Sequence, residues 1–502
     1  MDSHARVVLR DLGRLLHVPG LMALVTLPLC LFFGEYVAVV PFLSTAIAAL
    51  AVGQTLYRTF RHAPELRLYD AVVIAALGWL LVPVFGSIPF IWMALELHNV
   101  SSGLPAAVDF QDPWNAYFEA VSGFTSTGLT MVLHPSALPR SVQWWRSFMQ
   151  WVGGVGVIVL VLSVLRPSMG AYHLYFSEAR EEKIFPTVSS TVRTIWWIYV
   201  LYTLASVLLL KLVGMDWWAA LNYGMTGIAT GGFGVADHSL GDFGPAIQLA
   251  LVPIMIAGAV SFSSHYQILR EGRVEVLWKD SQHRAFWMFL TAGAAILFLE
   301  NYWSSGSFFW VDSAFQWTSS LCTAGFQTAD LTGWSPTAKL LMSAAMILGG
   351  AAGSTVGGIK QIRVVFLYKG LAWRFRRTSR QPHQIVRYEL DGKRLTETDA
   401  DRMVQAAAVL VALWAVTLWL GIFVLIHFVP PGFLLEDVIF EVASAQSNVG
   451  MSMGITHPEL PWGGKLVLIL AMWTGRLEIF PVLFLLSSVF RRSERLASRG
   501  VS

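Results

Sequence analysis

Ten apolar stretches, each about as long as a membrane-spanning helix, dominate this sequence of 502 residues and restrict what it can fold into. They cover residues 18–33, 37–57, 71–95, 142–165, 191–213, 245–269, 285–302, 337–368, 404–428 and 465–490. A helix needs about 20 apolar residues to cross the hydrocarbon core of a bilayer. Only 13% of the residues are charged, about half of what a soluble globular chain carries. The sequence therefore predicts an all-α integral membrane protein and not a large soluble enzyme.

Lys and Arg are concentrated in alternate connections between these stretches. The basic segments are residues 1–17, 58–67, 166–183, 270–284, 369–402 and 491–499. The positive-inside rule places such segments in the cytoplasm. We therefore expect a multi-pass protein of the cell inner (cytoplasmic) membrane, with both termini cytoplasmic. These basic runs are explained by topology and lipid headgroup contact, without nucleic acid.

A short motif that ends in glycine occurs four times, each time between two apolar stretches. FEAVSGFTSTG (118–128) aligns without a gap to FEVASAQSNVG (440–450), and WAALNYGMTGIATGGF (218–233) and FQWTSSLCTAGF (315–326) fit the same frame. One such match is weak evidence, because small residues before glycine are common. Four matches at equivalent places indicate a repeated unit of span, short helix, glycine hairpin and span.

The repeated unit predicts the organisation of the chain. We expect four helix–pore loop–helix repeats around one pore, preceded by two additional transmembrane helices. The predicted parts are a two-helix extension (1–68), repeat 1 (69–169), repeat 2 (170–275), repeat 3 (276–395, with an intramembrane loop at 349–360) and repeat 4 (396–502).

Each short apolar segment is flanked by spans that end on the same side of the membrane, so it must enter the bilayer and return. Non-helical backbone at that depth needs burial in protein or contact with water, and four loops that meet on one axis would provide both. Glycine permits backbone conformations that turn successive carbonyl oxygens inward, and these oxygens can replace the water shell of a cation. The simpler alternative is that glycine only allows close helix packing, which suits Gly153 and Gly154.

Several motifs together carry a family resemblance. STGLT (126–130), ATGGFG (229–234), CTAGFQTAD (322–330), NVGMSMG (448–454), GGAAGSTVGGIKQIR (349–363) and GRLEIF (475–480) are similar to segments of the bacterial Trk/Ktr superfamily, and most similar to its TrkH/TrkG branch of pore-forming subunits. The resemblance implies potassium uptake, a homodimer and a cytosolic, TrkA-like nucleotide-binding regulatory subunit. The implied potassium filter consists of Ser126, Thr127, Gly128, Thr230, Gly231, Gly232, Thr323, Ala324, Gly325, Asn448, Val449 and Gly450.

The resemblance also implies a gate below the filter, in the glycine-rich loop 349–360. Interior glycines destabilise a helix by about 1 kcal/mol each, so the span should break there; a kinked but continuous span is the alternative. The implied gate residues are Gly349, Gly350, Gly353, Ser354, Thr355, Gly357, Gly358, Lys360 and Arg476. Arg476 should contact this loop, or else pair with Glu478 or extend to the membrane surface.

Departures from the family pattern concern fine selectivity. Val356 replaces a frequent glycine, Ser126 and Thr127 replace a common Thr-Thr pair, and MSMG follows the fourth loop. A sodium-preferring or ammonium-passing transporter of the same architecture remains the alternative function, and the choice between channel and symporter stays open. Potassium would be cargo; we expect no cofactor in this chain and no enzyme site, since the phosphate-loop, HExxH and GxSxG motifs are missing from the sequence.

Other residues are predicted with less specific roles. Asp237 and Asp330 should concentrate cations at the outer mouth, and Glu119 and Glu441 should brace the filter or form ordinary buried pairs. Arg146 lies among tryptophans, which suggests an anchor at the membrane surface. Three histidines that follow the predicted filter could sense external pH: His134, His238 and His457.

Overall fold

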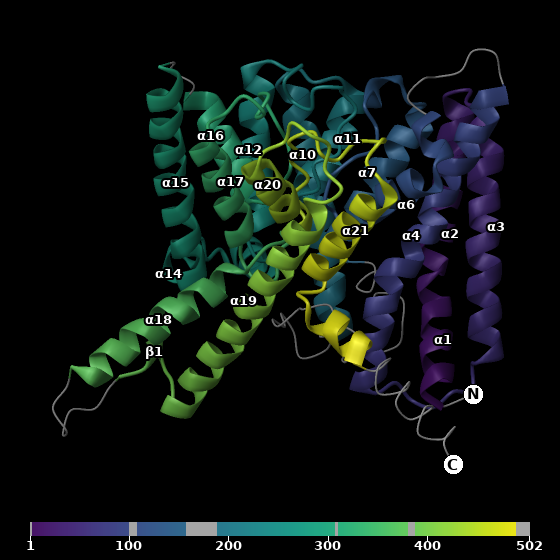
Figure 1. Ribbon diagram of the computed structural model, residues 1–502. Coiled ribbons are helices and arrows are strands. Elements are labelled where there is room, and N and C mark those ends of the chain that lie inside the picture. Colours follow the sequence, from purple (N-terminus) through teal and green to yellow (C-terminus); the bar gives the residue numbers. More distant parts are fainter. Residues whose placement is uncertain (1–2, 100–107, 157–187, 307–309, 380–386, 488–502) are drawn as a thin grey trace.

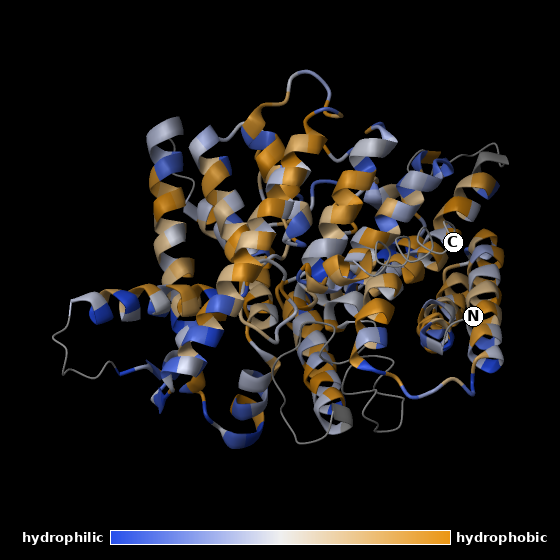
Figure 2. Cartoon of the chain, turned by 60° about the horizontal axis from the view of Figure 1, so that its bottom comes forward, coloured by the Kyte–Doolittle hydropathy of each residue, from blue (hydrophilic) through white to orange (hydrophobic). Residues whose placement is uncertain are grey.

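The computed structural model describes residues 3–99, 108–156, 188–306, 310–379 and 387–487, and these ranges are mostly helical (Figure 1). The strands within them are β1 (Glu389–Leu390) and β2 (Lys393–Arg394), which form a small antiparallel hairpin. Six helices of the described ranges are long and apolar enough to cross a membrane, and two bent helix pairs also qualify. Figure 2 shows hydrophobic residues along the helices and hydrophilic residues gathered at their ends. The predicted all-α membrane class is confirmed.

The N-terminal extension lies on one side of the bundle and contacts the first repeat. It consists of α1 (Ser3–Leu15), α2 (His17–Phe32) and α3 (Tyr36–Thr59). The first span is longer than predicted, because α1 and α2 together form an apolar helix of 30 residues. α2 packs along α3, and α1 packs against both α3 and the first helix of repeat 1.

Four helix–loop–helix repeats follow. Their first helices are α4 (Leu68–Asn99), α10 (Val188–Leu212), α15 (Ser281–Ser305) and α19 (Glu397–Leu425). Their short helices are α6 (Pro113–Phe124), α11 (Trp217–Ile228), α16 (Trp310–Leu321) and α20 (Leu435–Gln446). Their second helices are α7 (Arg140–Val155), α12 (Pro245–Ala259), α17 (Pro336–Leu348) and α21 (Trp462–Arg476).

All four short helices have 12 residues. At 1.5 Å per residue such a helix is about 18 Å long, too short to cross a hydrocarbon core of about 30 Å. In the first two repeats an aspartate begins the helix: Asp112 and Asp216 accept hydrogen bonds from the backbone N–H groups of Trp114 and Trp218. These caps satisfy donors that a helix start leaves open, so the entry point of the helix is set locally.

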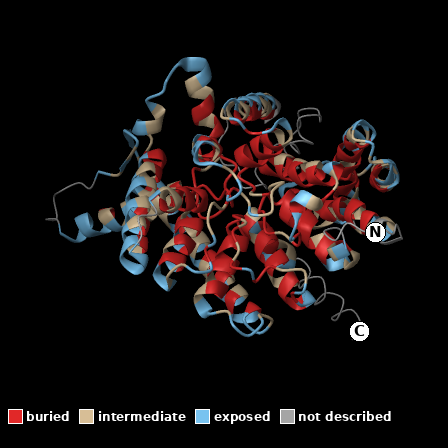
Figure 3. Cartoon of the chain, turned by 90° about the horizontal axis from the view of Figure 1, so that it is seen from above, coloured by how far each residue is buried: buried red, intermediate tan, exposed pale blue. Residues whose placement is uncertain are grey.

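The repeats close into a ring. The second helix of each repeat packs against the short helix of the next: α7 on α11, α12 on α16, α17 on α20 and α21 on α6. Since the last repeat contacts the first, the four short helices surround one axis. Seen from above, buried residues fill the centre of this ring (Figure 3).

Three predicted spans are not continuous, and the first is 245–269. α12 ends at Ala259, and α13 (Phe262–Glu271) continues at an angle of 101°. The carbonyls of Gly258 and Ala259 accept hydrogen bonds from Thr355 and Ala351 of the 349–360 loop. Because these carbonyls bond to another segment, the chain turns here.

The second is 465–490, where α21 ends at Arg476 and a helix over Phe480–Ser487 follows at 112°. Glu478 and Ile479 have φ values of 52° and 69°, which no right-handed helix contains. Pro481 is then the second residue of the new helix, a position where its missing N–H costs nothing.

The remaining connections complete the chain. The span predicted at 337–368 is divided, because α17 ends at Leu348 and α18 (Gln361–Thr378) begins after the 349–360 loop. Residues 157–187, which include the end of the span predicted at 142–165, lie outside the described residues. Short elements elsewhere are η1 (Asp109–Gln111), η2 (Pro135–Ala137) and α14 (Val276–Lys279).

Candidate functional site

Four glycine loops follow the short helices, and their backbones repeat one unusual conformation. We define glycine loops 1 to 4 as residues 125–131, 229–235, 322–328 and 447–453. In each loop the central glycine has positive φ, and so does the residue two positions earlier. The values are 101°, 85°, 76° and 101° for Gly128, Gly232, Gly325 and Gly450, and 55°, 51°, 47° and 54° for Ser126, Thr230, Thr323 and Asn448.

The same hydrogen bond ends each short helix. The N–H of the residue before the central glycine donates to a carbonyl five residues back: Thr127 to Ser122, Gly231 to Thr226, Ala324 to Ser319 and Val449 to Ser444, at 2.8–2.9 Å. Together with the left-handed residue, this bond is the Schellman arrangement that terminates helices. The chain therefore reverses in the same way four times.

The four loops meet. A Cβ atom built on Gly128 would lie 2.1 Å from the carbonyl oxygen of Gly231, and one on Gly232 would lie 2.9 Å from that of Ala324. One on Gly325 would lie 2.0 Å from the oxygen of Val449, and one on Gly450 would lie 2.2 Å from that of Thr127. Each loop thus touches the next and loop 4 touches loop 1, so no side chain fits at the central positions.

Polar side chains on the loops link neighbouring repeats. Ser126 Oγ donates to the carbonyl of Ala229 at 2.8 Å, and Asn448 Nδ2 donates to Thr127 Oγ1 at 2.9 Å. The short helices aim their C-terminal ends, which carry partial negative charge, at the same ring. Backbone carbonyls and helix ends together favour a cation on the axis and disfavour an anion.

A cavity of about 390 Å³ opens on one side of the ring, which we call the upper side. All four central glycines line it, and so do Asp237 and Asp330. The two aspartates that the sequence assigns to a mouth are therefore at the entrance to the loops. Carboxylates in this position raise the local concentration of cations.

The three candidate histidines have separate partners. His134 Nδ1 lies 3.5 Å from Asp237 Oδ2, His238 Nδ1 lies 2.9 Å from Asp242 Oδ1, and His457 Nδ1 accepts from the N–H of Glu459. Partial burial would raise the pKa of Asp237, but hydrogen bonds from Ser136 and the neighbouring His134 lower it below the usual value. Within the described ranges no group of three or more His, Cys, Asp or Glu could hold a metal ion.

Arg146 is not a surface anchor, and that prediction is wrong. Its side chain is 1% exposed, its Nε is 2.7 Å from Glu119 Oε1, and it also donates to Gly234 O and Thr130 Oγ1. The tryptophans beside it suggested an interface, but the side chain points inward because Glu119 offers a buried counter-charge. Arg146 thereby connects glycine loops 1 and 2.

Glu119 and Glu441 hold the backbone that follows the central glycines, which is one of the two roles predicted for them. Glu119 accepts from Met131 N at 2.8 Å, and Glu441 accepts from Met453 N at 2.9 Å. The second reading, a buried ion pair, applies to Glu119 but has no counterpart for Glu441 in the described part of the chain.

The 349–360 loop lies directly beneath three of the glycine loops. Thr355 Oγ1 is 3.2 Å from Thr230 Oγ1, and Gly357 N donates to Thr323 Oγ1 at 2.9 Å. A Cβ atom on Gly357 would lie 1.9 Å from the carbonyl oxygen of Ser447. The loop therefore covers the lower side of the ring without contacting it through bulky side chains.

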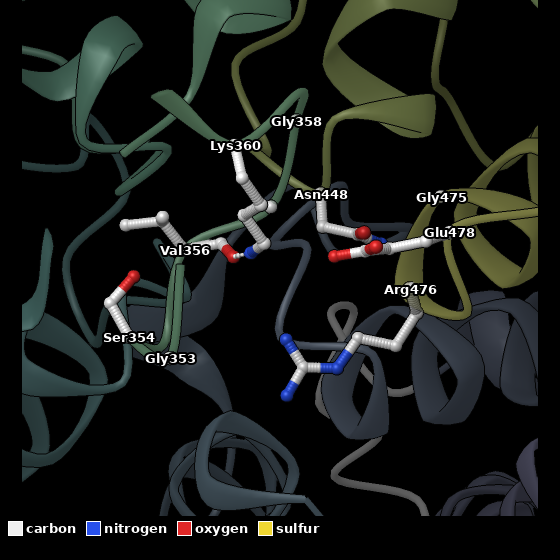
Figure 4. A pocket seen from close by; sticks show the side chains of 10 residues that line it. Gly353, Ser354, Val356, Gly358, Lys360, Asn448, Gly475, Arg476 and Glu478 are labelled. Atoms are coloured by element: carbon white, nitrogen blue, oxygen red, sulfur yellow. Dashed lines mark hydrogen bonds between the residues drawn. The ribbon is translucent and has the colours of Figure 1, made fainter. Parts of the chain in front are cut away.

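Arg476 reaches this loop from α21. Its Nη1 donates to Thr355 O at 3.3 Å, and its Nη2 donates to Gly153 O and Gly154 O. In Figure 4 the side chains of Arg476 and Glu478 both extend toward the 349–360 loop, and the carboxylate of Glu478 is bonded to Arg363. The contact with the loop that the resemblance implied is thus present.

A small cavity separates Arg476 from the lower residues of loop 4 (Figure 4). It holds about 40 Å³ and is lined by Val356, Lys360, Asn448 and Arg476, among others. Lys360 Nζ donates to the carbonyl of Val356 across the loop. Two cationic side chains therefore stand below the ring.

Some positioning residues were missed by the sequence reasoning. Lys339 pairs with Asp437 at 2.7 Å and Lys465 with Asp112 at 2.8 Å, so second helices are tied to the following short helices. Gln150, behind loop 2, was also missed. The sequence does contain a signal for the two lysines, because each is the fourth residue of its helix. This shared position is visible only when the second helices of the repeats are aligned with one another.

A closed ring of four re-entrant loops inside a bundle of apolar helices defines a membrane transport protein with a central pore. The comparisons with known proteins agree. The sequence profile of the TrkH family, described as cation transport protein, matches residues 40–496. The chain belongs to the TrkH family, as its motifs indicate.

The relatives match over nearly their whole length. An uncharacterized cation transporter of Methanocaldococcus jannaschii is 32% identical over 98% of this chain and 97% of its own. The Trk system potassium uptake protein TrkH of Halomonas elongata is 30% identical over 97% of this chain and 99% of its own. The crystal structure of the potassium transporter TrkH from Vibrio parahaemolyticus superposes with a TM-score of 0.80, at 29% identity, covering 96% of this chain and 98% of that one.

Proposed function

We propose that this protein takes up potassium through the ring of glycine loops, with the predicted filter residues supplying the oxygen ligands. The observation that carries the proposal is the ring itself: four loops of equal conformation in contact around one axis. Carbonyl oxygens held by a packed scaffold can replace the hydration shell of a monovalent cation. The relatives named as potassium uptake proteins support the choice of ion.

The 349–360 loop is the gate in this proposal, and Arg476 holds it closed. The loop occupies the path below the ring, and three of its backbone groups bond to α12 or α13. Arg476 attaches it to the carbonyls of Gly153 and Gly154 as well. A positive charge beneath the ring also opposes the passage of cations.

Partners act at the lower end of the molecule in Figure 1, which we assign to the cytoplasm. α18 begins directly after the gate loop and exposes Arg374, Arg376 and Arg377. A TrkA-like nucleotide-binding subunit that docks on this basic surface could pull on the gate through α18. We further propose a homodimer in the inner membrane, with both termini cytoplasmic.

Potassium uptake in cells that lack their own uptake systems tests the filter. The wild-type chain should restore uptake, and Gly232→Asp and Gly450→Asp should each lower it by about tenfold or more, since no side chain fits in the ring. Gly333→Asp is the matched control, because Gly333 has open space around it. Unchanged potassium affinity and selectivity in both ring variants would refute the filter assignment.

Competition decides between potassium and the alternative cations. Sodium, ammonium, rubidium and caesium are each added to the same uptake assay. Preferential inhibition by sodium or ammonium would favour the alternative transporter of the same architecture. Fluxes in vesicles clamped at the potassium equilibrium potential, with and without a proton gradient, separate channel from symporter.

Shortening the gate loop tests the gate. Deletion within Ala351–Val356 should produce a potassium leak in the absence of partner or nucleotide, because the loop covers the lower side of the ring. Leak is measured in reconstituted vesicles. A vesicle leak equal to that of the wild-type protein would show that the loop is not the barrier.

A further inference from the structure

One position breaks the fourfold pattern behind the loops. The eleventh residue of each second helix is Gln150 in α7, Met255 in α12, Met346 in α17 and Met472 in α21, and all four are completely buried. Three of the repeats thus place a methionine here, and the first repeat places an amide.

A second position breaks the pattern in the loop that this residue faces. The residue before the central glycine is Thr127, Gly231, Ala324 or Val449. Loop 2 alone has no side chain at this position. Since α7 packs against α11, Gln150 stands behind loop 2, so the two exceptions face each other.

The geometry explains why they occur together. A Cβ atom built on Gly231 would lie 2.4 Å from Gln150 Oε1 and 2.5 Å from its Cδ. The amide of Gln150 therefore occupies the space that the side chain before the central glycine takes in the other loops. Alanine at this position would have to displace it.

The amide also holds the backbone on both sides of the central glycine. Gln150 Nε2 donates to the carbonyl of Gly231, and Gln150 Oε1 accepts from the N–H of Phe233 at 3.0 Å. The carbonyl of Gly231 is the one that approaches Gly128 in the ring. Methionine could make neither bond and would leave two buried backbone groups without a partner.

We propose that Gln150 is a positioning residue that sets the cation selectivity of loop 2, in place of the side chain that Gly231 lacks. At the position before the central glycine, loops 1, 3 and 4 carry a side chain of their own, whereas loop 2 is held there by hydrogen bonds from Gln150. The donated bond fixes the direction of the Gly231 carbonyl and withdraws part of its negative charge from the axis. This inference rests on the proposed filter function.

The test compares the potassium-to-sodium preference of four variants, with uptake normalised to the amount of protein in the membrane. Gln150→Met and Gly231→Ala should each lower the preference by roughly five- to tenfold, the range expected for losing buried hydrogen bonds. The double variant should recover most of it, because it recreates the methionine and alanine that repeats 2 and 3 place at these positions. Gln143→Met is the control: in the described part of the chain, Gln143 bonds to Pro135, Ser136 and Trp218, all outside the ring. The preference of this variant should stay within about twofold.

The outcomes separate the two proposals. A wild-type preference in Gln150→Met, or a double variant that is as poor as the two losses combined, would overturn the inference. If Gln150→Met does not reach the membrane, Gly231→Ala alone tests the inference, because its Cβ atom must displace the amide of Gln150. An unchanged potassium-to-sodium preference in Gly231→Ala would also overturn the inference. If Gly232→Asp has no effect either, the filter function itself fails, whereas an effect of Gly232→Asp without one of Gln150→Met removes only this inference.

Discussion

Repeats 1 and 4 carry a glutamate at the same position of their short helices, yet these two buried carboxylates are stabilised differently. Glu119 and Glu441 each lie nine residues before a central glycine and accept a hydrogen bond from the N–H twelve residues on. Glu119 also pairs with Arg146, whereas the equivalent helix position in repeat 4 is Leu468. Glu441 is instead satisfied by Ser452 and Thr456.

The comparison shows that a buried carboxylate can hold the backbone of a glycine loop either with a positively charged partner, as in repeat 1, or with hydrogen bonds alone, as in repeat 4. The other two repeats use the same position again, with Tyr223 bonded to Ser239 O and Gln316 bonded to Thr328 Oγ1. Each repeat therefore has a polar side chain at this position, and this side chain holds the chain segment that follows the central glycine. A cation is an addition particular to repeat 1.

Removing that cation should give the largest effect. Arg146→Met leaves Glu119 buried without its partner, and breaking a buried pair in this way typically costs about 3–5 kcal/mol. The free energy of unfolding in detergent, or the melting temperature, measures the loss, and Glu119→Gln added to Arg146→Met should restore part of it. Arg140→Met, on the same helix but exposed, should be nearly neutral. A stable Arg146→Met protein would mean that the two carboxylates are equivalent after all.

Neutralising the carboxylates should sharpen the difference. Glu441→Gln keeps one acceptor oxygen and loses one hydrogen bond, so we expect a loss of about 1–2 kcal/mol. Glu119→Gln also strands the buried guanidinium of Arg146 and should cost more. Both variants are compared by thermal unfolding at one pH; equal losses would contradict the distinction.

The smallest expected effect concerns the mouth. The lowered pKa of Asp237 means that its contribution to stability is complete above the usual carboxylate range and is lost only as pH falls through the lowered value. Histidine is the residue type whose charge ordinarily changes in the physiological pH range. Replacing His134, His238 and His457 by Ala should remove a pH dependence of about twofold in uptake, and a profile that matches the wild type would exclude the sensor.

The sequence alone was enough for the class, the fourfold repeat and the glycine positions. The length of apolar stretches and the charge of loops are local properties of the sequence. A backbone conformation that only glycine adopts without strain is also visible in the sequence, because it requires a glycine, as at Gly128 and Gly450. The break at 349–360 followed from glycine content in the same way. The left-handed residues Ser126 and Thr230 carried no such mark, because serine and threonine occur in ordinary helix ends as well.

What only the tertiary structure decided depends on contacts between distant segments. Arg146 with Glu119, Gln150 with Gly231 and Lys465 with Asp112 are 27, 81 and 353 residues apart. Whether an arginine faces lipid headgroups or a buried carboxylate is set by what the other repeats place beside it, and no local pattern contains that information. The bends after α12 and α21 arise likewise, since the end of α12 bonds to the 349–360 loop and Glu478, after α21, bonds to Arg363.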